Sequence, residues 1–234
     1  MNRVFLVVWL FGGSMACEPS VLGSGIKHTQ YFSVPPFTKV VAGGEWKVII
    51  QEGGTQQVRV ATDDNLMEYL DLTVEGDELR IGSKKRINPR QGLEITIRVP
   101  KLDKLFLLGK SKGQVSFKGS GGTVEVAGKA YLTVNGDRGD LTVVARGAAR
   151  VTALGAVDTL TIKSTGASWI DAAKLVARTV HIIGADATRA TVRVMALLKL
   201  ELSGVASADY LGNPQVELGQ SDPARVHKMT RSLD

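Results

Sequence analysis

Hydrophobic and polar residues alternate in short runs along most of the chain, and from Leu105 onward the pattern repeats about every nineteen residues. Period-two alternation is typical of β-strands, whereas a fixed longer repeat is typical of a solenoid in which each repeat forms one coil. Glycines mark the repeat, and each follows an aliphatic residue by four positions: Gly109, Gly128, Gly147, Gly166, Gly184 and Gly204.

In a parallel β-helix, equivalent residues of successive coils stack about 4.8 Å apart, so a recurring aliphatic position forms an inward column. Glycine supplies the positive φ angle that the corners need. The position two residues after each glycine is small, with Asp186 as the exception. The leucine spacing and asparagine ladder of leucine-rich repeats are missing, which favours the β-helix. We predict one column of Leu105, Val124, Val143, Ile162, Val180 and Leu200, and a second of Val115, Val134, Ala153, Ala172, Ala190 and Tyr210.

The segment before the repeats contains strands with less regular spacing. A helical turn is predicted at residues 66–70, after the capping residues Asp63, Asp64 and Asn65. This segment would cover the first coil, whose apolar interior and free strand edges would otherwise be exposed. The predicted strands lie at residues 40–41, 46–50, 58–61, 72–74, 79–81 and 93–99.

The first seventeen residues have the pattern of a secretory signal peptide, with a positive start at Arg3, an apolar run over residues 4–11 and a small-residue exit. The run is too short to span a bilayer. The single cysteine, Cys17, follows a segment that resembles the lipobox of bacterial lipoproteins, with Ser14 where leucine is usual. We therefore predict a lipid anchor at Cys17, followed by a flexible tether over residues 18–30.

Over roughly residues 25–228 the sequence resembles the head GIN domain family of auto-transporter adhesins. The resemblance implies an all-β fold, a right-handed parallel β-helix (β-solenoid) with an irregular β-rich N-terminal cap, on an exported bacterial protein. It brings no catalytic residues with it. The expected domain is 31–228, with the cap at 31–100, the coils at 101–228 and a tail at 229–234. The matching segments are Phe37–Val41, Trp46–Gly53, Asp64–Leu70, Leu79–Ile81 and the glycine-cornered coils that follow.

The chain has a net charge of +6. The positive excess is concentrated between Arg80 and Lys118, a stretch that contains eleven Lys or Arg residues and only two acidic residues, Glu94 and Asp103. A basic surface attracts polyanions. For an exported protein we expect acidic polysaccharides or anionic envelope lipids as partners, and no nucleic acid. A solvated face that serves solubility is the alternative interpretation. The candidate polyanion-binding residues are Arg80, Lys84, Lys85, Arg86, Arg90 and Arg98.

No pattern in the sequence points to catalysis, a metal or a cofactor. The three histidines lie far from other ligand-type residues. The aspartates of the coils do not recur at one column offset, so we interpret them as turn residues and not as the paired carboxylates of a glycosidase. We predict a non-enzymatic adhesin or ligand-binding module of the cell envelope, in the outer membrane or periplasm. A self-assembling structural module that forms homo-oligomers and a polysaccharide-active β-helix enzyme are the alternatives.

Overall fold

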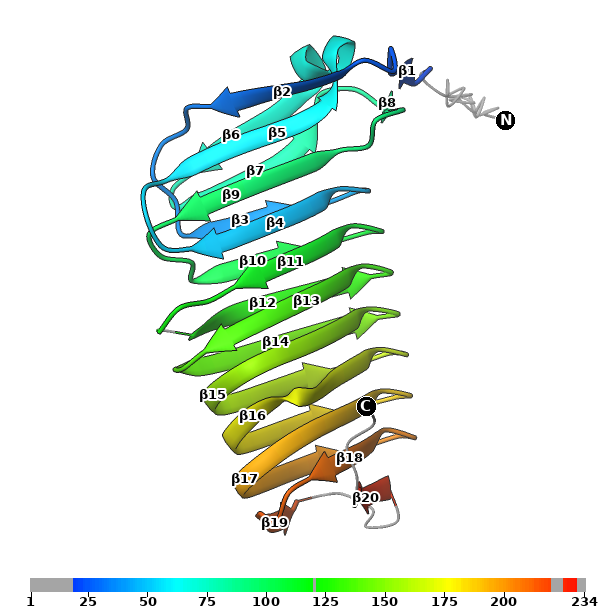
Figure 1. Ribbon diagram of the computed structural model, residues 1–234. Coiled ribbons are helices and arrows are strands. Elements are labelled where there is room, and N and C mark those ends of the chain that lie inside the picture. The colour runs from blue at the N-terminus through cyan, green and yellow to red at the C-terminus, as the bar shows by residue number, and fades with distance from the viewer. Residues whose placement is uncertain (1–18, 120, 220–224, 231–234) are drawn as a thin grey trace, which may run out of the picture.

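The computed structural model describes residues 19–119, 121–219 and 225–230, which form an elongated β-solenoid (Figure 1). Each regular coil has one strand in a back layer and one in a front layer, named as they lie in Figure 1. The chain passes from back to front at the right-hand edge and then descends, so the coils wind in the right-handed sense that parallel crossovers favour. The predicted all-β solenoid is confirmed.

Parallel pairing between successive coils builds the regular part of the solenoid. In the later coils a single long strand continues around the left-hand edge and contributes to both layers. The strands of this part are β10 (Lys104–Leu107), β11 (Lys112–Ser116), β12 (Gly121–Gly128), β13 (Tyr131–Asp137), β14 (Asp140–Gly147), β15 (Arg150–Ser164), β16 (Trp169–Gly184), β17 (Arg189–Leu202), β18 (Ser207–Leu211), β19 (Gln215–Leu218) and β20 (Val226–Lys228).

The two coils above β10 and β11 are stacked out of sequence order. Strands β3 (Lys39–Ala42) and β4 (Lys47–Glu52) pair with β10 and β11, and β7 (Glu78–Ser83) and β9 (Glu94–Val99) stack above β3 and β4. After β9, the chain therefore runs down past the β3–β4 coil before it begins β10. The buried Glu52 carboxylate fastens this passage by accepting the backbone N–H groups of Leu102 at 3.3 Å and Lys118 at 2.5 Å.

An antiparallel cap closes the N-terminal end. Strand β5 (Gln57–Asp63) pairs antiparallel with both β9 and β2 (Lys27–Phe32). The predicted tether over residues 18–30 is thus partly wrong, because these residues contribute strands to the folded domain. The predicted helical turn is a 3₁₀ helix that begins two residues earlier. The other cap elements are β1 (Val21–Leu22), β6 (Leu70–Glu75), β8 (Ile87–Asn88) and the 3₁₀ helix η1 (Asp64–Tyr69).

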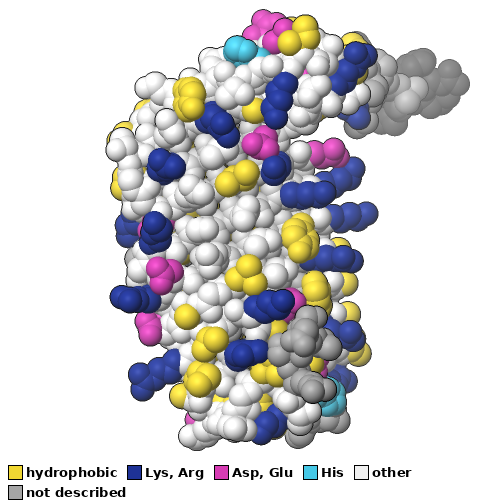
Figure 2. Space-filling model, viewed as in Figure 1, with side chains coloured by type: hydrophobic (Ala, Val, Ile, Leu, Met, Phe, Trp, Pro, Cys, Tyr) yellow, Lys and Arg dark blue, Asp and Glu magenta, His cyan; other side chains and the backbone are white. Residues whose placement is uncertain are grey.

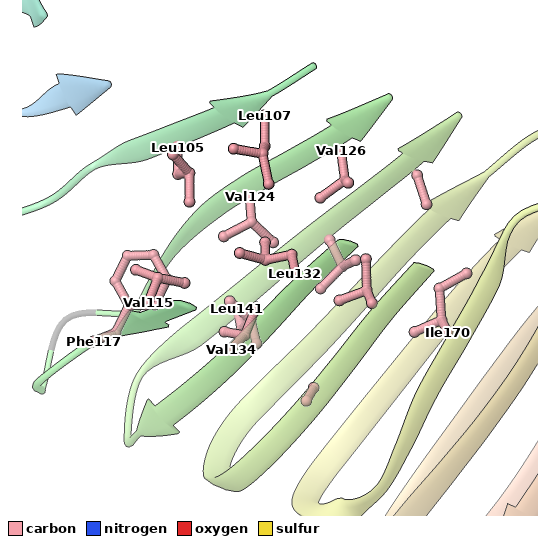
Figure 3. Packing of buried hydrophobic residues seen from close by; sticks show 14 of the residues in the cluster. Leu105, Leu107, Val115, Phe117, Val124, Val126, Leu132, Val134, Leu141 and Ile170 are labelled. Carbon is pink, nitrogen blue, oxygen red and sulfur yellow. The ribbon is translucent and has the colours of Figure 1, made fainter. Parts of the chain in front are cut away.

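The core is a continuous stack of aliphatic side chains between the two layers (Figure 3). Leu105 and Val124 lie one above the other in the back layer, and Leu132 lies in the front layer; all three are fully buried. Phe117 fills the space beside Val115. Gly122 allows this packing, because a Cβ there would lie 2.2 Å from the Phe117 ring.

Strand register corrects both predicted columns at one coil. Ile182 and Val192 occupy the positions predicted for Val180 and Ala190, so that the observed first column is Leu105, Val124, Val143, Ile162, Ile182 and Leu200. The cause is the identity of the corner residue. Asp186, at φ 62°, occupies the left-handed corner instead of Gly184, and its Oδ2 accepts the Gly166 N–H at 2.8 Å.

Gly184 lies inside β16 and makes room for a larger residue at the small position. Thr188 is buried there, where the other coils have serine or alanine. A Cβ on Gly184 would lie 3.0 Å from both the Thr188 hydroxyl and the Leu202 side chain. The glycine therefore compensates for the extra volume of the threonine, and the repeat keeps its thickness.

Candidate functional site

Charged residues on the outer surface of the back layer are largely neutralised by one another. Glu125 is contacted by both Lys104, at 2.9 Å, and Arg146, and its side chain is only 14% exposed. Because each partner lies on a neighbouring coil, strand register itself creates these pairs. Other ion pairs on this surface are Lys39–Asp77 at 3.0 Å, Arg80–Glu78 at 3.0 Å and Lys199–Glu217 at 3.1 Å, and the His181 ring lies 3.2 Å from the Glu201 carboxylate.

The front layer has a different outer surface. The first residue of each front strand follows the right-hand turn, and register stacks these residues into one line parallel to the solenoid axis. Cations and aromatic rings alternate strictly along its middle. We define the cation–aromatic column as Lys112, Tyr131, Arg150, Trp169 and Arg189, which lie on five successive coils.

The cations of this column are not neutralised by neighbouring acids. Lys112, Arg150 and Arg189 are exposed, and none of them has a carboxylate of the described chain within ion-pair distance. The line continues above to Lys47, which is paired with Glu94 at 2.8 Å, and below to Ser207. Along this line, the cations without an ion-pair partner among the described residues therefore lie between Lys112 and Arg189.

The two aromatic rings of the column are half-exposed. Tyr131 is 40% exposed and Trp169 is 39% exposed. The Tyr131 hydroxyl lies 3.3 Å from the Thr152 hydroxyl on the next coil, so the ring extends over its neighbour and does not project straight into solvent. Large aromatic residues kept at a polar surface in this way are typical of binding surfaces.

Further cations lie at the turns beside the column. Figure 2 shows Lys and Arg side chains following the right-hand edge, next to a largely uncharged middle of the front layer. Lys110 hydrogen-bonds to Glu45 at 2.9 Å and holds the pKa of that carboxyl below its usual value. Lys129 occupies the equivalent turn position one coil below and is exposed. The edge thus adds positive charge to the same side of the molecule.

The basic residues predicted from the sequence do not lie on one surface. Arg80 is on the back layer and pairs with Glu78 at 3.0 Å, whereas Arg98 is on the front layer. Lys84, Lys85, Arg86 and Arg90 lie at the N-terminal end, around β8. The Lys85 ammonium lies 5.3 Å from the centre of the Tyr69 ring. The structure therefore brings together only residues 84–90 of the predicted set.

Several of the coil aspartates serve the turns, as predicted. Asp158 accepts the Gly139 N–H at 3.2 Å, and Asp171 accepts the Ala173 N–H at 3.1 Å. A groove of about 480 Å³ lies on the back layer and is lined by Arg146, Lys163 and Glu201 among others. Within the described ranges no helix is long and apolar enough to cross a bilayer. Cys17, the predicted lipidation site, lies outside them.

Comparison with known proteins gives a family and a set of similar folds. The family model described as "Putative auto-transporter adhesin, head GIN domain" matches residues 36–214. No curated protein matches the chain.

Three similar solved structures come from two species. A "putative adhesin" from Bacteroides fragilis has a TM-score of 0.73 at 20% identity, with 89% of this chain and 96% of that chain covered. A "putative adhesin" from Parabacteroides distasonis has a TM-score of 0.71 at 17% identity, with 90% and 100% covered. A "putative lipid binding protein" from the same species has a TM-score of 0.66 at 19% identity, with 91% and 100% covered. At these identities the solved structures show only that the fold is shared, and the match to the family model is what places the chain in a family. This chain belongs to the head GIN domain family of auto-transporter adhesins.

Proposed function

We propose that this chain is a non-enzymatic, adhesin-like protein of the bacterial cell envelope that is exported by residues 1–17, is lipid-anchored at Cys17 and binds a polyanion. Family membership supports the adhesin-like role. The observation that carries the binding proposal is the contrast between the two outer surfaces. Register pairs most charges of the back layer, whereas three cations of the front layer, stacked in one column, have no acidic partner in the described chain. Unpaired, exposed charge attracts a ligand of opposite sign.

The basic residues of the cap support attachment to an anionic membrane. The Val21 N–H donates to the Arg86 carbonyl at 2.8 Å, so the start of the folded domain lies beside the loop with Lys84 and Lys85. Three residues lie between Cys17 and Val21, so the four Cα–Cα steps that join them reach at most about 14 Å. A lipid at Cys17 would therefore bring this loop to the headgroups, where each basic residue contributes about 1 kcal/mol. The coils would then project away from the membrane.

The anchor is tested by labelling cells with a radioactive fatty acid and fractionating them. The wild-type protein should incorporate label and sediment with membranes, and the Cys17→Ser protein should do neither. A Lys84→Gln, Lys85→Gln variant should keep its label but bind phosphatidylglycerol vesicles more weakly than wild type does. A Cys17→Ser protein that stays in the membrane fraction would contradict the anchor.

The binding role is tested with cells that display the protein. They should adhere to polyanion-coated surfaces more than cells without the protein do, and adhesion should fall as the salt concentration rises. Retention that is equal on neutral and anionic surfaces would contradict the proposal. Reducing ends released from a polysaccharide would instead indicate an enzyme, and a molar mass that grows with concentration in the absence of adhesion would indicate a structural module.

A further inference from the structure

The cation–aromatic column has the geometry of a site for a linear polymer. Its neighbouring residues lie about 4.8 Å apart, because they occupy equivalent positions on adjacent parallel strands. Like residues are therefore about 10 Å apart, and the whole column is about 19 Å long. Its cations, Lys112, Arg150 and Arg189, and its rings, Tyr131 and Trp169, each recur on every second coil. A ligand that matches this spacing must carry a negative group and a flat apolar surface in alternation.

A row of polar side chains lies next to the column on the same surface. It consists of the next outward residue on each strand, Gln114, Thr133, Thr152, Asp171 and Thr191. Hydroxyl and amide groups can donate and accept hydrogen bonds in either direction, as sugar hydroxyls require. The single carboxylate in this row, Asp171, accepts a backbone N–H of its own turn.

We propose that the cation–aromatic column binds an acidic polysaccharide laid parallel to the solenoid axis, with a carboxylate on every second sugar. The carboxylates contact the cations, and the C–H faces of the intervening sugars pack on Tyr131 and Trp169, whose ring faces carry partial negative charge. A disaccharide in an extended chain has a length close to the two-coil repeat. This inference rests on the proposed adhesin-like function and names its ligand and site.

Other polyanions fit the column less well. A lipid headgroup layer is a plane and favours apolar side chains that project from one end of a protein. The column instead follows the long side of the solenoid, and its Tyr131 ring extends over the neighbouring coil. A single-stranded nucleic acid would use stacking rings in a groove. The front layer is instead a flat sheet between its edges, with rings only about every 10 Å.

The test measures the affinity of the purified protein for hyaluronan oligosaccharides, which carry one carboxylate in every disaccharide, by calorimetry over a range of salt concentrations. Arg150→Gln should weaken binding about threefold to fivefold and reduce the salt dependence. Trp169→Thr should weaken binding about tenfold and leave the salt dependence unchanged, because it removes packing and no charge. Threonine already occupies many outward strand positions, so this variant should fold.

Matched controls remove the same groups elsewhere. Lys163 is an exposed cation on the back layer of a middle coil, and Tyr31 is an exposed ring on β2. Lys163→Gln and Tyr31→Thr should bind hyaluronan as wild type does. Neutral cellohexaose should bind far more weakly than a hyaluronan hexamer.

Three results would overturn the proposal. One is an equal loss of affinity in Arg150→Gln and Lys163→Gln, and another is no effect of Trp169→Thr. The third is binding to phosphatidylglycerol vesicles or oligothymidylate that is tighter than binding to hyaluronan and is weakened by both Arg150→Gln and Trp169→Thr. In each of these cases cells that display the protein could still adhere to polyanion-coated surfaces, so failure of the column is distinguishable from failure of the adhesin-like function. Loss of all polyanion adhesion would reject both.

Discussion

Replacing a corner glycine with alanine should destabilise the solenoid by more than the strain of a single residue. Gly166 has a φ of +79°, and a Cβ there would lie 2.8 Å from the Gly147 carbonyl oxygen in the coil above. The left-handed conformation costs alanine about 1–2 kcal/mol. The backbone contact adds about 1–3 kcal/mol, and alanine recovers about 0.4–1 kcal/mol by stiffening the unfolded chain. We expect Gly166→Ala to lose about 3 kcal/mol.

Alanine substitutions at two other glycines separate the cost of the left-handed conformation from the cost of the backbone contact. Gly76 has a φ of +63° with nothing within 4 Å of a Cβ, so Gly76→Ala carries the strain without the contact. Gly82 has neither the strain nor the contact. Gly76→Ala should therefore lose about 1 kcal/mol, and Gly82→Ala should be as stable as wild type or slightly more stable.

Thermal unfolding followed by far-ultraviolet circular dichroism measures the series. A change of 1 kcal/mol shifts Tm by about 2–4 °C in a chain of this size. Gly166→Ala should unfold about 6–12 °C below wild type, and Gly76→Ala about 2–4 °C below. If Gly166→Ala loses no more than Gly76→Ala, close stacking of corner backbones is not what makes glycine necessary there.

Two further predictions concern aspartates that bond to backbone groups. Burial raises the pKa of Asp63, but N–H donation by Gln91, Gly25 and Arg90 outweighs it and leaves the pKa below its usual value. The stabilisation of the fold by the Asp63 carboxylate is therefore present above the unfolded pKa of about 3.9 and is lost as the pH falls through the lower pKa that Asp63 has in the folded protein. The free energy of unfolding of Asp63→Asn, measured by urea titration, should be about 2 kcal/mol lower than that of wild type at neutral pH and should vary less below pH 4. Equal acid sensitivity of the two proteins would contradict this. Asp186→Ala keeps the strained corner without the bond to Gly166 and should lose about 1–2 kcal/mol, whereas Asp186→Gly should be near neutral. Equal urea midpoints for these two variants would refute the assigned role of Asp186.

Much of the fold follows from local sequence patterns. The aliphatic positions that recur with the glycines do point inward, because buried and more exposed residues alternate along most of each regular coil strand. The predicted inward columns are wrong by two residues at one coil, because the corner there is occupied by Asp186 and not by Gly184, two residues earlier. The sequence pattern alone does not distinguish a glycine that forms a corner from a glycine, such as Gly184, that leaves room for a neighbouring side chain such as Thr188.

The order of the first coils could not be predicted. Strands β7 and β9 stack above β3 and β4, and only long-range pairing decides this order. The predicted tether failed for a similar reason: β2 is exposed along most of its length and has no apolar alternation, and its antiparallel pairing with β5 holds it.

The candidate site escaped the sequence search because it is not contiguous. A search for clustered charge finds the stretch from Arg80 to Lys118, and the structure divides the six candidates chosen from it among three places. The column has one residue per coil, three positions after each corner, and its cations alternate with rings. Listing that offset along the repeat gives Lys112, Tyr131, Arg150 and Trp169 directly from the sequence. The fifth member, Arg189, requires the corner to be placed at Asp186.

The most direct test of the column follows the fluorescence of Trp169 during a titration with hyaluronan oligosaccharides. The chain has three tryptophans, of which Trp46 is buried and Trp9 lies in the first seventeen residues. A Trp9→Phe, Trp46→Phe protein therefore reports on Trp169 alone. We predict a saturable shift of its emission to shorter wavelength, with a midpoint equal to the calorimetric Kd and raised by Arg150→Gln. Unchanged Trp169 emission while calorimetry records binding would contradict the account.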